Sequence, residues 1–282
     1  MSKKAVLYLS FLLPLAVAGS AVGQMPGSVS DVNVIEVVQS GQINWTAGTI
    51  RTTGMGAAPE EITNPVQAAA LAERAAVTVA RRNLLEIIKG VRVDSETIVE
   101  NFITTSDVIK TKISGQIQGA QVVEKRNLTA GGVEVVMEIK LRGAFSDTIL
   151  PQTPTFPQIT EEPGKFVPDK VYTGLVINAK GLNLRPAMAP KIMNEQGEEI
   201  YGSAFISRDY AVTQGMVGYS RSMLDAVKNE RVADTPVVVR ALKSSGNTNT
   251  DLIIGNSDAL ALIAAARNLN FLQQCKVMIV LD

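Results

Sequence analysis

Paired carboxylates are the residues in this sequence best suited to acid–base chemistry. They occur at Glu60-Glu61, Glu161-Glu162 and Glu198-Glu199. A glycosidase needs two carboxyl groups that face each other across a substrate. Adjacent acids in a loop, or on opposite faces of a strand, do not face each other in this way. We therefore interpret these pairs as solvated surface residues and not as a catalytic pair.

Nucleophilic catalysis and metal binding are limited by the absence of histidine and by a single cysteine, Cys275. Histidine is the side chain best suited to proton transfer near neutral pH and the commonest metal ligand. Without it a Ser-His-Asp or Cys-His arrangement is excluded, and one cysteine can form neither an internal disulfide nor a thiolate metal cluster. We expect no enzyme activity, no cofactor and no metal, and we interpret Cys275 as a small buried apolar residue beside the last strand.

The remaining candidate sites lack the spacing that their chemistry needs. Gly54-Met55-Gly56 has neither the spacing nor the following helix pattern of a dinucleotide-binding loop. One group of acids has no EF-hand spacing and would bind calcium only if the fold brought its members together. Its members are Asp94, Glu96, Glu100 and Asp107. We expect Arg81-Arg82 to lie on a solvated helix face, with contacts to acids or lipid headgroups as the alternative.

The charge balance disfavours nucleic acid as a partner. The chain has 27 basic and 27 acidic residues. Removal of an N-terminal leader containing Lys3 and Lys4 would leave 25 of the 27 basic residues and all of the acids. A protein that binds a phosphate backbone needs a basic excess, which this chain lacks.

Residues 1–23 have the pattern of a secretory signal peptide. The basic segment Ser2-Lys3-Lys4 precedes the apolar run Ala5–Val22, and Ala21-Val22-Gly23 places small residues at −3 and −1. We therefore predict cleavage between Gly23 and Gln24, with Ala16-Val17-Ala18 as a second candidate site. The alternative is an uncleaved anchor, but the run is at the lower limit of membrane-spanning length. We expect the mature chain to have no membrane span.

The clearest element after the leader is a helix that begins near Pro65 and ends near Gly90. Asn64 can cap it, proline suits its first position, and glycine is typical of its end. Small and apolar residues recur inside it at helical spacing. These residues are Ala69, Ala72, Ala76, Val79, Ala80, Leu84 and Ile87. A stripe so rich in alanine allows a helix to lie close to a sheet.

Strands are predicted on both sides of this helix. Residues 42–45 and 49–54 form a hairpin that ends at Gly54 and Gly56, and residues 34–38 are a short β-rich run before it. After the helix, residues 133–141 alternate apolar and polar side chains, as in a half-buried strand.

Two more elements complete the first domain. We expect residues 91–99 to be extended and a second helix to run from Ser106-Asp107 to Gln118. The domain, residues 24–150, is thus predicted to be α+β, with helices packed on a mainly antiparallel sheet.

Five prolines between residues 151 and 169 predict a stiff linker. Residues 170–282 then form a second, mixed α/β domain. Its expected strands lie at 172–177, 237–239, 252–254 and 277–281. Weak helical periodicity follows Asp209 up to Val227, and Ser257 can cap a helix that runs to Leu269.

The order and spacing of residues from about Gln42 to Gly143 resemble the LPP-twenty lipoprotein family. The resemblance rests on the alanines before Arg82-Asn83-Leu84, on Ile88-Lys89-Gly90-Val91, and on the alternating strand from Val133. It continues between these segments at Val93, Ser95, Thr97, Phe102, Asp107, Ile109, Gly115 and Gly119-Ala120. The family includes small outer-membrane lipoproteins and flagellar basal-disk and basal-body ring proteins of Gram-negative bacteria.

The resemblance implies an exported domain with a structural or assembly role in the cell envelope, and it carries no catalytic residue to this chain. Family lipoproteins have a cysteine directly after the signal peptide, whereas residues 19–26 contain none. We therefore expect no lipidation, a location in the periplasm with outer-membrane association, and protein partners or self-association. The alternative is a periplasmic module that binds a small ligand between its two domains.

Overall fold

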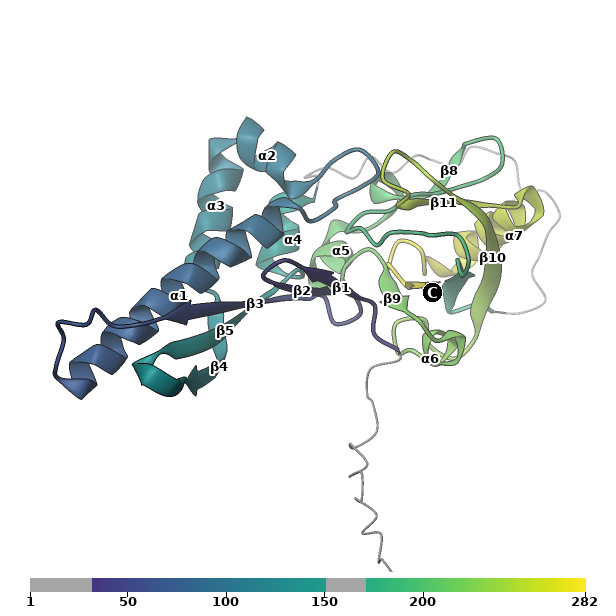
Figure 1. Ribbon diagram of the computed structural model, residues 1–282. Helices are drawn as coiled ribbons and strands as arrows, with labels where there is room; N and C mark the ends of the chain where they lie inside the picture. The colour runs from purple at the N-terminus through teal and green to yellow at the C-terminus, as the bar shows by residue number, and fades with distance from the viewer. Residues whose placement is uncertain (1–31, 151–170) are drawn as a thin grey trace, which may run out of the picture. The chain divides into compact units, whose positions relative to one another are not determined.

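The computed structural model describes residues 32–150 and 171–282 (Figure 1). The predicted signal peptide, its cleavage site at Gly23 and Gln24, and the proline-rich segment 151–169 lie outside the described residues. The α+β class is confirmed, with one antiparallel and one mixed sheet. Both sheets belong to one compact unit, Asp31–Asp282.

The first sheet has five antiparallel strands in the order β1-β2-β3-β5-β4. The strands are β1 (Ile35–Val38), β2 (Gly41–Asn44), β3 (Thr49–Gly56), β4 (Gln121–Asn127) and β5 (Val133–Lys140). The helices of this part are α1 (Pro65–Lys89), α2 (Val99–Thr105), α3 (Asp107–Gln118) and α4 (Ala144–Ile149). In Figure 1, α1 runs along one face of the sheet, over β3 and β5.

Helix α1 follows its predicted boundaries. The Asn64 side chain accepts hydrogen bonds from the backbone N–H groups of Val66 and Gln67, and Gly90 is the C-cap. Its buried residues are Ala72, Ala76, Ala80, Leu84, Ile87 and Ile88. Ala69 and Val79 were expected in the same stripe but are exposed. Ala69 is exposed because α1 has no buried residue before Ala72. Val79 is exposed because it lies beside the row of residues that contacts the sheet.

The prediction that the hairpin ends at Gly54 and Gly56 was right for Gly56, the last residue of β3, and wrong for Gly54, which lies inside the strand. A Cβ at Gly54 would lie 2.2 Å from the Ala76 carbonyl oxygen and 2.4 Å from the Ala80 nitrogen. A Cβ at Gly56 would meet the backbone of the preceding helical turn equally closely, at 2.3 Å from the Ala72 carbonyl oxygen. The glycines are therefore needed for helix–sheet contact and not for a turn.

Other expectations for this part were confirmed in part. The Ser106 side chain caps α3, which ends at Gln118 as predicted. Residues 91–98 hold only an isolated bridge, between Arg92 and Ile98, where an extended segment was expected. Helix α2 was not predicted, because it has only seven residues, and Val99, Phe102 and Ile103 give its apolar face too few positions to show a period.

The second sheet has seven strands in the order β8-β7-β11-β10-β6-β12-β9. They are β6 (Gly174–Asn178), β7 (Ile192–Met193), β8 (Glu199–Tyr201), β9 (Gly218–Ser220), β10 (Pro236–Ser245), β11 (Asp251–Ile254) and β12 (Val277–Val280). The pairs β10–β6, β6–β12 and β12–β9 are parallel. Strand pairs β10–β11 and β7–β8 are antiparallel, and β7 pairs with β11 in parallel.

The helices of this part are α5 (Arg208–Gln214), α6 (Met223–Val227) and α7 (Asn256–Leu269). The helical periodicity predicted after Asp209 was wrong in its middle, since Gly218, Tyr219 and Ser220 form the buried edge strand β9. Pairing with β12 outweighs the weak local pattern there. Helix α7 begins at Asn256, so Ser257 lies in its first turn instead of capping it.

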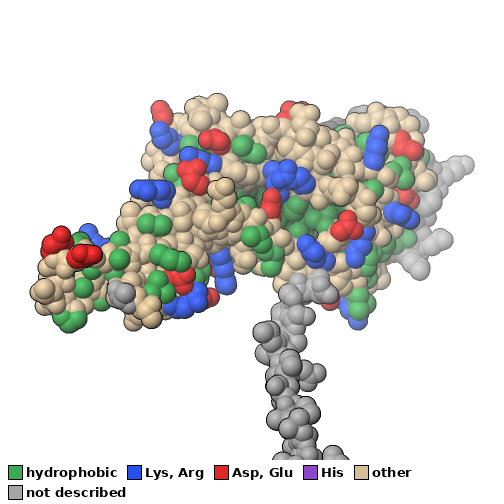
Figure 2. Space-filling model, viewed as in Figure 1, with side chains coloured by type: hydrophobic (Ala, Val, Ile, Leu, Met, Phe, Trp, Pro, Cys, Tyr) green, Lys and Arg blue, Asp and Glu red, His purple; other side chains and the backbone are tan. Residues whose placement is uncertain are grey.

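A single apolar cluster joins the two sheets. It contains Ile50 and Leu84 from the first part and Ile177, Leu252 and Ile279 from the second, all nearly inaccessible to solvent. On the face shown in Figure 2, acidic and basic side chains are interspersed, and neither sign forms a broad patch. Among the described residues, no helix is both long and apolar enough to cross a membrane.

Candidate functional site

A cleft of about 540 Å³ opens where the parallel strands of the second sheet end. Ala179 directly follows β6, Arg221 follows β9, and Leu281 and Asp282 follow β12, and all of them line the cleft. In α/β sheets, ligands bind preferentially beyond the carboxyl ends of parallel strands. The opposite wall comes from the first part of the chain, through β1 and Arg92.

The wall is built on a bidentate ion pair between Arg92 and Glu36. The Arg92 Nη1 and Nη2 atoms donate to Glu36 Oε1 and Oε2 at 3.0 and 2.5 Å. Arg92 is only 5% exposed. Burial alone would raise the pKa of Glu36, but the hydrogen bonds and charge of Arg92, with smaller effects of Trp45 and Arg185, outweigh it and hold that pKa below its ordinary value.

Trp45 completes this cluster from the loop after β2. Its Nε1 donates to Glu36 Oε2 at 3.0 Å, and the Arg92 guanidinium lies 5.6 Å from the centroid of its ring, within cation–π range. The ring also packs edge-on against Tyr219 of β9, with centroids 6.1 Å apart. The indole therefore touches both the ion pair and the second sheet.

Arg92 also binds the second part of the chain through its backbone and its Nε. Its Nε donates to the Pro186 carbonyl at 2.8 Å, and its own carbonyl accepts from the Met188 N–H at 3.0 Å. Tyr219 continues the contact, since its hydroxyl donates to the Ala187 carbonyl at 2.8 Å and accepts from the Ala187 N–H at 3.0 Å. We call the contact between the Glu36–Arg92–Trp45 cluster and the second sheet the junction. The polar side-chain groups of these three residues and of Tyr219 are all paired within the protein.

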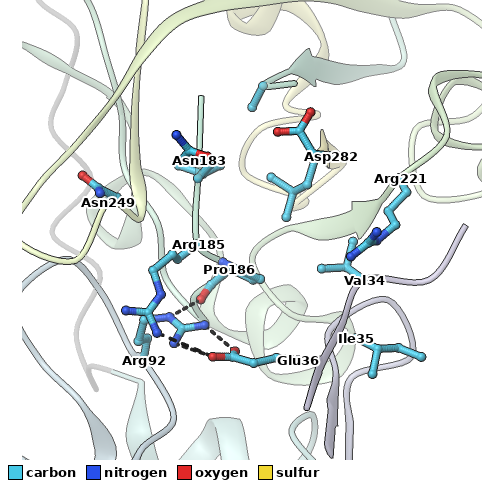
Figure 3. A pocket seen from close by; sticks show the side chains of 13 residues that line it. Val34, Ile35, Glu36, Arg92, Asn183, Arg185, Pro186, Arg221, Asn249 and Asp282 are labelled. Atoms are coloured by element: carbon cyan, nitrogen blue, oxygen red, sulfur yellow. Dashed lines mark hydrogen bonds and ion pairs between the residues drawn. The ribbon is translucent and has the colours of Figure 1, made fainter. Parts of the chain in front are cut away.

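The outer part of the cleft is less fully paired. Figure 3 shows Arg92 and Arg185 pointing toward Glu36 from two different segments, with Arg185 Nη2 3.6 Å from Glu36 Oε1. The Asp282 carboxylate accepts from the Gly181 N–H at 2.9 Å. Arg221 is exposed, and among the described residues it has no ion pair in the structure. These groups could orient an anionic or polar ligand, but none of them is an activated nucleophile.

The acids singled out in the sequence do not come together. Glu60, Glu61 and Glu198 are exposed, as predicted, whereas Glu199 is half-buried. Burial raises the pKa of Glu199, partly offset by Lys191 at 3.7 Å. The pair Glu161-Glu162 lies outside the described residues.

Asp94, one of the acids without EF-hand spacing, and Arg81 of the arginine pair both form local hydrogen bonds. Asp94 accepts from the backbone N–H groups of Glu96 and Thr97, and no group of acids, cysteines or histidines in the described segments could hold a metal ion. Arg82 is exposed as expected. Arg81 departs from that expectation, because it is half-buried and donates to the Gln118 carbonyl at 2.8 Å.

Cys275 is fully buried beside β12, as predicted. Burial raises the pKa of its thiol to about 11, against smaller opposing effects of a hydrogen bond with Tyr201 and the charge of Arg231. The Glu36–Arg92–Trp45 cluster was not predicted from the sequence. Its members lie in three separate segments, and the only signal was a charge within each of two apolar runs, at Glu36 and at Arg92.

Comparison with known proteins assigns a family likeness to each part of the chain. Residues 48–140 match the LPP20 lipoprotein family. Residues 174–282 match the family described as the second domain of Treponema pallidum Tp0624. The search of curated proteins found no match. The LPP20 match confirms the resemblance found in the sequence and spans the sheet strands β3, β4 and β5 together with α1, α2 and α3.

Proposed function

We propose that this protein is a non-enzymatic component of the bacterial cell envelope with a structural or assembly role. The observation that carries the proposal is the match of residues 48–140 to the LPP20 lipoproteins. The junction between the two sheets is consistent with it, because its buried polar groups bind one another and leave none for chemistry. We place the mature chain in the periplasm, after removal of residues 1–23, in an outer-membrane-associated complex.

Within this proposal the chain is not itself lipidated. The described part of the chain holds one cysteine, Cys275, and it is fully buried. An acyl chain therefore has no accessible thiol among these residues. Metabolic labelling with a radioactive fatty acid should leave the protein unlabelled, and label in the purified protein would contradict this part of the proposal.

Self-association through a sheet edge is the route that the fold offers. Strand β4 is an edge strand of the first sheet, and all of its residues are exposed. Val122 and Val123 are 43% and 39% exposed on it. An exposed edge presents unpaired backbone groups that a second copy can pair with. Unpaired lysines on an edge strand oppose such pairing, whereas Lys125 and Arg126 of β4 already form ion pairs with Glu73 and Glu134.

The test is the mass of the chain beginning at Gln24, measured by light scattering over a concentration series. We expect a discrete oligomer that dissociates in the Val122→Lys, Val123→Lys double variant. Val66→Lys is the matched control, because Val66 is 79% exposed on α1, away from any strand edge. A wild-type chain that stays monomeric at all concentrations, or an oligomer that the double variant leaves intact, would contradict self-association by this edge.

The cellular test is fractionation of the native bacterium. The full-length chain should be found in the periplasmic and outer-membrane fractions, and a chain without residues 1–23 should remain in the cytoplasm. The flagellar basal body is the first complex to examine, since the family resemblance includes its ring proteins. A deletion strain that swims normally would remove the flagellum from the proposal without affecting the envelope location.

A second function, the binding of a small ligand, is favoured by the cleft beyond β6, β9 and β12. Its volume, about 540 Å³, is within the usual range for ligand sites, and Arg185, Arg221 and Asp282 offer polar contacts. Native mass spectrometry of the protein purified from its own periplasm tests this. A bound species lost in Arg221→Gln would support the ligand-binding function, and its absence would leave the structural role.

A further inference from the structure

A second cavity, of about 400 Å³, is lined by two arginines that form no ion pair within the described residues. Arg142 lies between β5 and α4, and Arg231 lies between α6 and β10. The cavity shares no lining residue with the cleft beyond β6, β9 and β12. Gln214, Gly218, Glu230 and Met278 are among the residues that line it.

Arg231 is held in place by neutral groups. Its Nη1 donates to the carbonyls of Gly215 and Cys275 at 3.0 and 2.8 Å, and its Nη2 donates to the carbonyl of Gln214, the last residue of α5. Burial lowers the pKa of Arg231 to about 10, and the charge of Arg142 contributes. The guanidinium remains charged at neutral pH. Backbone carbonyls hold it in position, and they are neutral, so they do not balance its charge.

Arg142 is half-buried and only weakly held. Its one described hydrogen bond runs from Nη2 to the Thr46 carbonyl at 3.3 Å. Burial lowers its pKa as well. A Cβ at Gly215 would lie 4.0 Å from Arg142 Nε, while the Gly215 carbonyl binds Arg231. The two guanidiniums therefore flank the same glycine.

The groups nearest these arginines do not neutralise them. Cys275 and Tyr201, which lie close to Arg231, have pKa values raised by burial and are protonated at neutral pH. Glu230 lines the cavity but is exposed and forms no ion pair within the described residues. Arg142 and Arg231 are both half-buried, so water screens their like charges only in part, and an anion bound between them would relieve the repulsion.

The space beside Arg231 is kept open by a glycine. Gly218 has an ordinary negative or extended φ, so its backbone does not require glycine. A Cβ there would lie 3.0 Å from Arg231 Nε and 2.3 Å from Met278 Sδ. The missing side chain leaves the Nε edge of the guanidinium accessible from the cavity.

We propose that this cavity binds a phosphate group, held between the guanidiniums of Arg142 and Arg231. Guanidinium groups match the geometry of phosphate oxygens and donate charge-assisted hydrogen bonds to them. A phosphate between them supplies the negative charge that the cavity lacks. The phosphate belongs either to a soluble compound or to a lipid headgroup, which share this chemistry.

The test uses inorganic phosphate as the probe and the mature chain from Gln24 as the protein. Phosphate should raise the unfolding temperature in a dose-dependent way, compared with chloride at equal ionic strength. Arg142→Gln should weaken phosphate binding about tenfold or more, because it removes one charge-assisted contact. The same variant should unfold at the same or a higher temperature without phosphate, since it removes an unpaired charge. That behaviour separates a binding role from a structural one.

Two variants serve as controls. Glu230→Gln removes the nearby negative charge and should tighten binding roughly two- to five-fold. Arg82→Gln removes an exposed arginine of α1 and should leave phosphate binding unchanged. The proposal is overturned if phosphate acts no differently from chloride on the wild type, or if Arg142→Gln binds phosphate as the wild type does.

Vesicles separate the two sources of phosphate. Wild-type protein that sediments with phosphatidic acid vesicles, but not with phosphatidylcholine vesicles, and loses this in Arg142→Gln, identifies a lipid headgroup. Phosphate binding without vesicle binding identifies a soluble phosphate compound. Vesicle binding that survives in Arg142→Gln, with no effect of inorganic phosphate, contradicts the proposed site.

Discussion

Replacement of Gly54 by alanine tests the close contact between α1 and β3, on which the first sheet depends. The added Cβ would lie 2.2 Å from the Ala76 carbonyl oxygen, 2.4 Å from the Ala80 nitrogen and 2.8 Å from the Ala80 Cβ. Comfortable contacts between such atoms begin near 3.5 Å. Since two of these three atoms belong to the helix backbone, no side-chain rotation can relieve the overlap, and α1 must move away by about an ångström.

The expected cost follows from two opposing effects. Overpacking of a tight core costs about 1–3 kcal/mol, and a clash with backbone lies at the upper end of that range. Alanine also restricts the unfolded chain and thereby stabilises the fold by about 0.4–1 kcal/mol. The clash outweighs this gain, so we expect Gly54→Ala to lower the free energy of unfolding by about 2 kcal/mol.

Gly115→Ala provides a matched control for the same chemical change. Gly115 lies inside α3, and a Cβ there would meet nothing within 4 Å. Alanine at an open helix position is about 1 kcal/mol more favourable than glycine. The two substitutions should therefore change stability in opposite directions.

Urea unfolding, followed by the fluorescence of the single tryptophan, measures both variants. Trp45 is 5% exposed in the folded protein, so its emission reports unfolding of the junction. A Gly54→Ala variant as stable as the wild type would refute the close contact and with it the explanation of why β3 continues through glycine.

Further predictions concern the junction and the buried thiol. Glu36→Gln should destabilise the protein by about 3 kcal/mol in urea unfolding, because it leaves the buried Arg92 charge without a carboxylate, while exposed Glu60→Gln should change stability by less than about 0.5 kcal/mol. The pKa of Glu36 is lower in the folded state, so its contribution is present above its ordinary pKa of 4.5 and is lost as pH falls through the depressed value. The difference between wild type and Glu36→Gln should therefore be large at pH 7 and shrink well below pH 4, and an equal difference at both would contradict the assignment. Cys275 is buried with a pKa of about 11, so iodoacetamide at pH 8 should modify it only in urea, as mass spectrometry can show.

The sequence predicted those elements whose signals are local. Helix α1 carries its cap, its alanine stripe and its C-terminal glycine within one segment, and β5 shows its alternation directly. The buried thiol at Cys275 could be predicted because a lone cysteine in an apolar run is usually core. The function of Gly54 could not, because a glycine in a turn and a glycine under a helix have the same sequence signal.

The features that the sequence did not predict depend on contacts between distant segments. Glu36 and Arg92 are 56 positions apart, and nothing in either segment specifies the other. Strand β9 has three residues and depends on its parallel pairing with β12. The two cavities likewise combine loops from both parts of the chain, so neither could be derived from spacing alone.

The centre of the junction favours the structural role over ligand binding. The rim of the junction does not distinguish the two. At the centre, the bidentate pair of Glu36 and Arg92, the Trp45 indole and the Tyr219 hydroxyl all have partners within the protein. A ligand there would have to displace contacts that hold the two sheets together. At the rim, Arg221 is exposed and available. A ligand that bound there would contact β1 and the strand ends of the second sheet at once, and would stabilise the junction instead of competing with it. Arg221→Gln therefore separates the two functions. The binding function predicts loss of the ligand and of the stability that it adds, whereas the structural function predicts no change, because Arg221 forms no ion pair within the described residues.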